Sequence, residues 1–228
     1  MAVPVVQSYS GSSTSTGTVT TTAPTGIVDN DLLVFVASTD WAAAGTAAYT
    51  PPAGLTELFP YSRTNAGTAA GVSYQSWYKI ASSEAGSYIL TLGSARLTAW
   101  SITRIDGQDT TTPIDGTAGT IVDSGEPIHP SIITSVNNCL ILHPVAWDLS
   151  KTFVSAPSGD IGVGSVDVSG HDQWIYRNSQ VTAGAHPAGT WDISAAAQHI
   201  AVTVAIKEVQ GAPPAATFLP RMQMLGVG

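Results

Sequence analysis

The sequence has 228 residues, of which 43% are hydrophobic and only 11% are charged, and its net charge is −8. This acidic balance argues against an electrostatic grip on nucleic acid or on an anionic membrane surface. The length suits one large all-β domain or two small ones. Abundant Thr, Ser and Val favour strands, and 22 Gly and 14 Pro supply the turns between them.

Cysteine usage and the first residues bear on the compartment. Cys139 is the only cysteine, so no internal disulfide is possible, and its apolar neighbours favour a structural thiol. Residues 1–10 contain no Lys or Arg ahead of an apolar stretch, and no apolar run is long enough for a membrane span. The sequence therefore predicts a protein made in the cytoplasm that stays soluble until it assembles.

The first half of the chain reads as a series of strands. Val3–Tyr9 and Thr16–Thr22 are predicted opening strands, and the apolar run Leu32–Ala37 predicts a strand buried on both faces. A long loop is expected through Trp41–Pro60. Three further strands, separated by turns, are predicted at Val72–Ala81, Ser87–Leu92 and Arg96–Ile105.

A connector, Asp106–Glu126, holds five acidic residues and no basic residue. Its oxygen ligands are of the kind that Ca²⁺ prefers, although their spacing matches no known metal loop. The alternative is a set of solvated turns, because Asp tolerates turn dihedrals and accepts hydrogen bonds from its own backbone. The Asp-Gly pairs favour the turns.

The second half repeats the first. Asn30 to Val34 is echoed by Asn138 to Leu142, Pro52–Gly54 by Pro157–Gly159, and Trp77 by Trp174. Neither half has enough strands to cover its own apolar face. We therefore expect one domain over residues 1–210, an antiparallel two-sheet β-sandwich of jelly-roll type built from pseudo-repeats at 17–107 and 127–209. The strands expected in the second half are Leu140–Trp147, His171–Asn178, Thr190–Ser194 and Ile200–Lys207.

No catalytic or metal-binding motif is visible. The histidines show no i,i+4 or H-x-H spacing, and no nucleophile or phosphate-loop motif occurs, so we expect no enzyme activity, no metal site and no cofactor. His171 and Asp172, beside Trp174, are either the polar floor of a sugar site or, as we favour, a hydrogen-bonded surface pair. The five histidines are His129, His143, His171, His186 and His199.

The six tryptophans divide three and three between the halves, which favours core packing. Trp41 is an exception, because it opens the predicted long loop with Tyr49 and Tyr61 nearby. Exposed aromatic rings stack on sugars, so these three residues form a candidate carbohydrate site.

The final segment, residues 211–228, combines Gly and Pro with side chains too apolar for a free solvated tail. We expect an extended assembly arm that docks on another chain or exchanges within a homo-oligomer. Folding back over its own sandwich is the alternative. The apolar residues of the arm are Phe218, Leu219, Met222, Met224 and Leu225.

Three runs in the first half carry a resemblance to a known family. They are Asp29-Asn30-Asp31-Leu32-Leu33-Val34, then Pro52-Ala53-Gly54, then Trp77-Tyr78-Lys79-Ile80-Ala81 followed by Glu84 and Tyr88. Together they resemble a module of tailed-bacteriophage virion proteins, over about residues 17–107. The resemblance implies a β-sandwich displayed on a phage particle, and it implies no catalytic residue.

On this basis we expect a non-enzymatic virion protein, foremost a capsid decoration or cement protein that binds the major capsid protein. Its location would be the virion, after synthesis in the host cytoplasm. A tail-associated fibre or spike is the nearest alternative. A carbohydrate-binding module for host or environmental glycans is a second class, and a glycan lyase or hydrolase is a third.

Overall fold

The computed structural model describes residues 2–40, 49–64, 71–84, 86–148, 151–168 and 171–209. These residues form an all-β, antiparallel structure, as predicted, with two main sheets of five strands each. Among the residues described, no helix is long and apolar enough to cross a membrane.

The two large sheets have the same topology. The first has the order β1-β8-β3-β6-β5 and the second has the order β9-β19-β12-β15-β14, so each strand of the first half has a counterpart in the second. The strands of the first sheet are β1 (Val5–Thr14), β3 (Leu32–Asp40), β5 (Thr56–Arg63), β6 (Val72–Ile80) and β8 (Thr98–Asp106). Those of the second are β9 (Ile114–Gly125), β12 (Cys139–Asp148), β14 (Ile161–Val168), β15 (His171–Gln180) and β19 (Ala197–Ile206).

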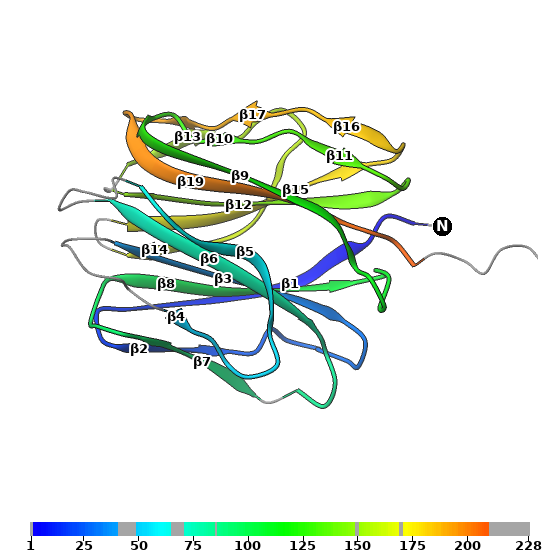
Figure 1. Ribbon diagram of the computed structural model, residues 1–228, viewed down its shortest axis with the longest axis horizontal. Helices are drawn as coiled ribbons and strands as arrows, with labels where there is room; N and C mark the ends of the chain where they lie inside the picture. Colours follow the sequence, from blue (N-terminus) through cyan, green and yellow to red (C-terminus); the bar gives the residue numbers. More distant parts are fainter. Residues whose placement is uncertain are drawn as a thin grey trace, which may run out of the picture.

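Each large sheet is backed by a smaller outer layer, so the molecule has four layers (Figure 1). In the first half this layer is one three-stranded sheet, β2-β7-β4, with β2 (Thr18–Thr22), β4 (Tyr49–Thr50) and β7 (Ser87–Leu92). In the second half it is split into three two-stranded pieces, β10-β17, β11-β16 and β13-β18. Their strands are β10 (Ile128–His129), β11 (Ile132–Thr134), β13 (Phe153–Ser155), β16 (Gly184–His186), β17 (Gly189–Thr190) and β18 (Asp192–Ile193).

The layering explains why β3 and β12 are apolar runs with no alternation. Leu32 and Val34 face the other large sheet, whereas Leu33 and Phe35 face the outer layer of their own half. Both faces of the strand are therefore buried, as the sequence predicted for Leu32–Ala37.

The described residues form five apolar clusters, and three of these are large. The largest lies between the two five-stranded sheets and draws on both halves. The next two in size lie one in each half. Four tryptophans are at most 3% exposed, which confirms the core assignment for them: Trp77, Trp100, Trp147 and Trp191.

The backbone confirms the internal repeat. Asn30 and Asn138, which precede β3 and β12, both have positive φ, at 76° and 56°. Gly54 and Gly159 also share this left-handed conformation, at 82° and 89°. The two halves thus turn at equivalent points of the chain.

One pairing of the repeat needs correction. Trp77 lies opposite Phe35, and the residue opposite His143, which is the counterpart of Phe35, is Tyr176. Trp77 therefore corresponds to Tyr176 and not to Trp174. The error is two residues, which keeps the side chain on the same face of the strand.

Two predicted loops are wrong. The expected loop Trp41–Pro60 contains β4 and the start of β5, and the expected connector Asp106–Glu126 contains the twelve-residue edge strand β9. The small residues of β9 do not show the apolar alternation by which a strand is recognised in a sequence. The packing of β9 nevertheless requires small residues. Gly119 packs directly under the ring of Phe59, which leaves no room for a side chain. Since β1 and β9 complete the two large sheets, both repeats also begin earlier than predicted.

Two connector acids accept hydrogen bonds from backbone amides. Asp109 accepts hydrogen bonds from the amides of Thr111 and Thr112, at 2.7 and 3.0 Å. Asp115 accepts from the amide and hydroxyl of Ser135, both at 2.5 Å. The Asp109 bonds match the predicted turn role, whereas Asp115 lies within β9 and its bonds reach a residue 20 positions away, so the turn predicted at Asp115 is wrong.

His171 and Asp172 are buried and not on the surface, which corrects the predicted surface pair. His171 Nε2 lies 2.7 Å from the hydroxyl of Ser38 in the other half. Gln173 donates to the same hydroxyl at 3.0 Å and accepts from Ser101 at 2.5 Å. Polar side chains thus join the two large sheets across an apolar interface.

The shared interface predicts one cooperative unfolding transition. Leu142 is fully buried between the sheets, so Leu142→Ala should lower the free energy of unfolding by about 2–5 kcal/mol and destabilise both halves together. Ile121→Ala is the control, because Ile121 is 47% exposed on β9 and its loss should cost at most about 0.5 kcal/mol. Chemical denaturation followed by tryptophan fluorescence measures both. Two separate transitions would show that the halves unfold independently.

Burial lowers the pKa of His171 to about 4, so the folded protein resists a proton that the unfolded chain accepts below about pH 6.5. Stability present above pH 6.5 is therefore lost as the pH falls towards 4. His171→Gln removes this contribution and keeps a partner for Ser38. Between pH 7 and 5 its free energy of unfolding should fall less than that of the parent protein. Equal pH slopes in parallel denaturation series would contradict the assignment.

Candidate metal centre

The structure describes two of the three residues of the first predicted sugar site, Tyr49 and Tyr61. Tyr49 is 8% exposed, and its hydroxyl donates to Thr39 at 2.7 Å inside the first half. Tyr61 packs against it, with ring centres 5.8 Å apart, so the two tyrosines are neighbours as expected. Trp41 lies outside the described residues, as do the arm residues Phe218, Leu219, Met222, Met224 and Leu225.

Part of the second predicted sugar site lines a pocket. Asp172 and Trp174 line a pocket of about 410 Å³ together with Asp167 and Phe153. Asp172 also accepts a hydrogen bond from the indole of Trp147 at 3.0 Å. His171 does not line this pocket, so it is not part of any sugar floor there.

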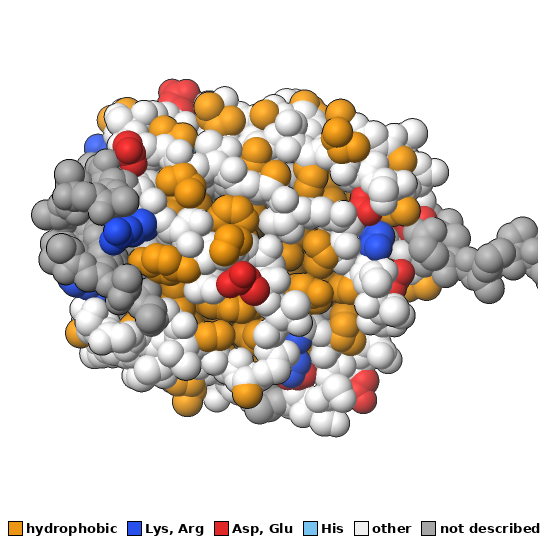
Figure 2. Space-filling view, viewed as in Figure 1, with side chains coloured by type: hydrophobic (Ala, Val, Ile, Leu, Met, Phe, Trp, Pro, Cys, Tyr) orange, Lys and Arg blue, Asp and Glu red, His pale blue; other side chains and the backbone are white. Residues whose placement is uncertain are grey.

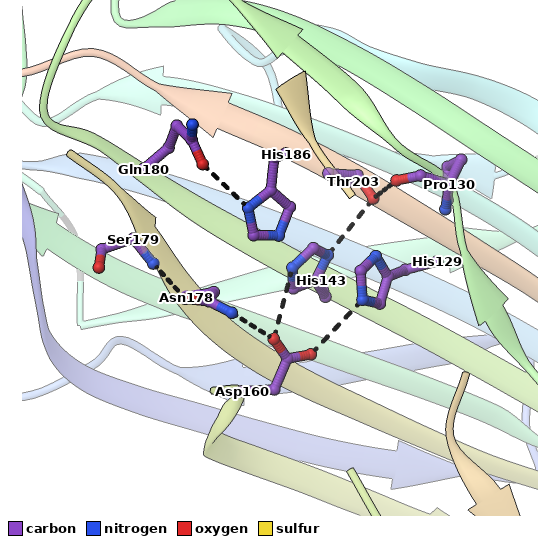
Figure 3. Close-up of polar contacts among 9 residues, drawn as sticks. All are labelled: His129, Pro130, His143, Asp160, Asn178, Ser179, Gln180, His186 and Thr203. Carbon is purple, nitrogen blue, oxygen red and sulfur yellow. Dashed lines mark hydrogen bonds and ion pairs between the residues drawn. The ribbon is translucent and has the colours of Figure 1, made fainter. Parts of the chain in front are cut away.

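Three histidines that the sequence left scattered come together in the second half (Figure 3). The rings of His129 and His143 are 3.8 Å apart between centres, and the ring of His186 lies 5.3 Å from that of His143. They come from β10, β12 and β16, so the cluster spans the large sheet and its outer layer. Sequence spacing could not find it, because 14 and 43 residues separate the three.

Asp160 completes the cluster from the turn between β13 and β14. The left-handed backbone of Gly159 and a hydrogen bond from the Asp160 amide to the Pro157 carbonyl, 3.1 Å long, fix this turn. Its Oδ2 lies 3.8 Å from His129 Nε2, and its Oδ1 lies 3.7 Å from His143 Nε2. The three side chains are at most 3% exposed. These separations are too long for hydrogen bonds.

Neighbouring hydrogen bonds fix the protonation of His143. The Thr203 hydroxyl donates its single proton to the Pro130 carbonyl at 2.7 Å. It can therefore only accept from His143 Nδ1, which lies 3.3 Å away. The Nε2 atom of His143 then carries a lone pair and points towards Asp160.

Asp160 is held in a similar way. The Ser179 amide donates to Asn178 Oδ1 at 2.7 Å, which turns the Asn178 amino group towards Asp160. That group donates to Asp160 Oδ1 at 2.9 Å. The carboxylate therefore has a fixed direction, with Oδ2 left facing His129.

Burial sets the charges of the cluster. Burial, together with the neighbouring imidazoles, lowers the pKa of His129 to about 4 and that of His143 to about 2. Burial also raises the pKa of Asp160 to about 6, despite the hydrogen bond from Asn178. At pH 7 an ionised carboxylate thus faces two neutral imidazoles. Neutral His and ionised Asp are the forms that bind metal ions.

A pocket of about 410 Å³ opens beside the cluster and is lined by His129, Asp160, His186 and Gly189. A side chain at Gly189 would collide with His129 Nε2 and with Pro157, so only glycine keeps this imidazole in place. The residues around the cluster therefore leave a path for a small ion or molecule.

No family model, no curated protein and no solved structure matches this chain.

The hydrogen bond to His143 can be tested by substitution. Thr203→Val should lower the free energy of unfolding by about 1–3 kcal/mol, because it leaves His143 Nδ1 and the Pro130 carbonyl without their partner. Thr203→Ser keeps the hydroxyl and should cost clearly less. Urea denaturation at pH 7 compares them. Equal losses would mean that the hydroxyl does not hold the ring.

Proposed function

We propose that this chain is a non-enzymatic structural component of a tailed-phage virion, and specifically a decoration protein on the capsid surface. The observation that carries the proposal is the structural role of the residues that resemble the phage module. Asn30 and Gly54 make the left-handed turns, and Trp77 fills the core of the first half.

Polar residues of the same resemblance also support the scaffold. Asp31 accepts a hydrogen bond from the Val28 amide at 2.8 Å and pairs with Arg104 at 2.6 Å. Lys79 forms an ion pair with Glu84 at 2.8 Å, and Glu84 also accepts a hydrogen bond from the Tyr88 hydroxyl. A motif that serves only the fold is what a display module needs, because its partners bind the surface and no reaction constrains its interior.

The surface offers an apolar area suited to such partners. Figure 2 shows hydrophobic side chains gathered over the middle of one face, where β5, β6 and β9 lie in Figure 1. Ile121, which belongs to β9, is 47% exposed. Only 11% of the residues are charged, which also favours contact of this surface with other proteins.

The test uses particles of the phage that encodes the chain. Antibody labelling should place the full chain on the capsid, at a fixed copy number by gel. A chain lacking residues 211–228 should keep its melting temperature within about 2 °C, because the arm is expected to lie apart from the sandwich, and should be missing from particles. Normal incorporation of the shortened chain into particles would refute the assembly role of the arm. Absence of the full chain from particles would refute the virion role, and label on the tail would refute capsid decoration.

A further inference from the structure

We propose that His129, His143 and Asp160 bind one Zn²⁺ ion, which fastens the outer layer of the second half to its five-stranded sheet. The three residues come from β10, β12 and the turn before β14, so a shared ion would join three separate segments. This inference stands independently of the virion role.

The spacing of the ligand atoms suits a small ion. One ligand atom from each residue lies within 4.8 Å of the other two. A tetrahedral Zn²⁺ ion sits about 2.0–2.2 Å from nitrogen and oxygen ligands, which places those ligands roughly 3.4 Å from one another. The observed 3.8 and 3.7 Å run to different oxygens of Asp160, so binding through one oxygen requires the ligand atoms to close from within 4.8 Å to about 3.4 Å.

The ligand types favour zinc over the common hard cations. Two imidazoles with one carboxylate form a set that Zn²⁺ binds well, whereas Ca²⁺ and Mg²⁺ prefer oxygen ligands throughout. Three protein ligands leave one tetrahedral position for water or a further ligand. The adjoining pocket gives that position room.

Unsatisfied atoms point to the same conclusion. His143 Nε2 and Asp160 Oδ2 are buried and have no hydrogen-bond partner among the described residues. Since the proton of His143 is on Nδ1, a lone pair faces a carboxylate at 3.7 Å. Such an arrangement is unfavourable in a buried site unless a cation lies between the two.

The first half of the chain provides an internal comparison. Phe35 lies five residues after Asn30, as His143 lies five after Asn138, and Phe35 is buried in an apolar cluster. Leu55 follows Gly54, as Asp160 follows Gly159, and it packs against the same cluster. The fold thus accepts apolar side chains at both positions. The polar pair in the second half is not required by the architecture.

The surrounding hydrogen bonds have the pattern of an outer shell around a metal. The Thr203 hydroxyl accepts a hydrogen bond from Nδ1 of His143, and the Asn178 side chain donates one to Asp160. Such partners orient metal ligands and fix the tautomer of histidine.

An ion here also has a structural task. The outer layer of the first half is one continuous sheet, whereas that of the second half consists of three two-stranded pieces. Two-stranded pieces are weak alone, and a metal bridge to β12 compensates for the missing continuity.

The experiment uses the full chain, purified without a polyhistidine tag and freed of metal by a chelator. Calorimetric titration with ZnCl₂ at pH 7.5 should give one site per chain. At 100 times the dissociation constant, zinc should raise the melting temperature by roughly 5–10 °C. Co²⁺ should bind in the same place and give the visible absorption of a tetrahedral site.

Two substitutions copy the first half: His143→Phe and Asp160→Leu. Both should retain a cooperative unfolding transition, lose the Co²⁺ absorption and weaken zinc binding at least 100-fold. His171→Gln is the control, because His171 is a buried histidine away from the cluster, and it should bind zinc like the parent protein.

Three results would overturn the proposal. They are the lack of stoichiometric zinc binding by the parent protein, unchanged binding in His143→Phe, and an equal response to Ca²⁺. If either copied variant fails to fold, Gly189→Ala provides the remaining test. Its added methyl group collides with His129 Nε2 and with Pro157 and should weaken zinc binding at least tenfold, and unchanged affinity would refute the site.

Discussion

The burial of one five-stranded sheet against the other is the constraint on which the rest of the structure depends. The two strands β3 and β12 contribute large apolar side chains to this interface, and those of Leu32, Val34, Leu140 and Leu142 are at most 1% exposed. Each such side chain contributes about 1.5–3 kcal/mol when fully buried. Neither sheet can leave this face in water, so the two halves form one structural unit even though each also has a smaller core of its own.

Polar groups within this interface determine how the sheets align. An apolar surface alone tolerates sliding, because dispersion contacts are not directional. Gln173 crosses from the second sheet to Ser38 and Ser101 of the first, and His171 reaches the same Ser38. A shift of either sheet would leave these buried groups without partners, which costs more than the bonds contribute in place. They therefore select one alignment.

The sequence predicted those features that depend on local pattern. The run at β3, the repeated Asn and Gly turns and the buried tryptophans follow from periodicity and backbone preference, and the structure confirms them. It failed for β9, because Gly119 is small to make room for Phe59, a contact made by a residue far away in the chain. The histidine cluster was missed for the same reason. Its ligands meet only after β10, β12 and the β13–β14 turn have packed together, and nothing in the spacing of His129, His143 and Asp160 records that meeting.

Duplication explains how one half can hold such a cluster. Along β12, Leu142 and Ala146 face the shared interface, while His143 and Val145 face the outer layer. Alternation along the strand therefore separates the residues that join the two halves from those that line the smaller core. A polar residue at position 143 weakens only the smaller core, because the large interface is built from the opposite face. The first half, with Phe35 at this position, keeps the apolar form of the module, and the second half carries the polar cluster without loss of the common architecture.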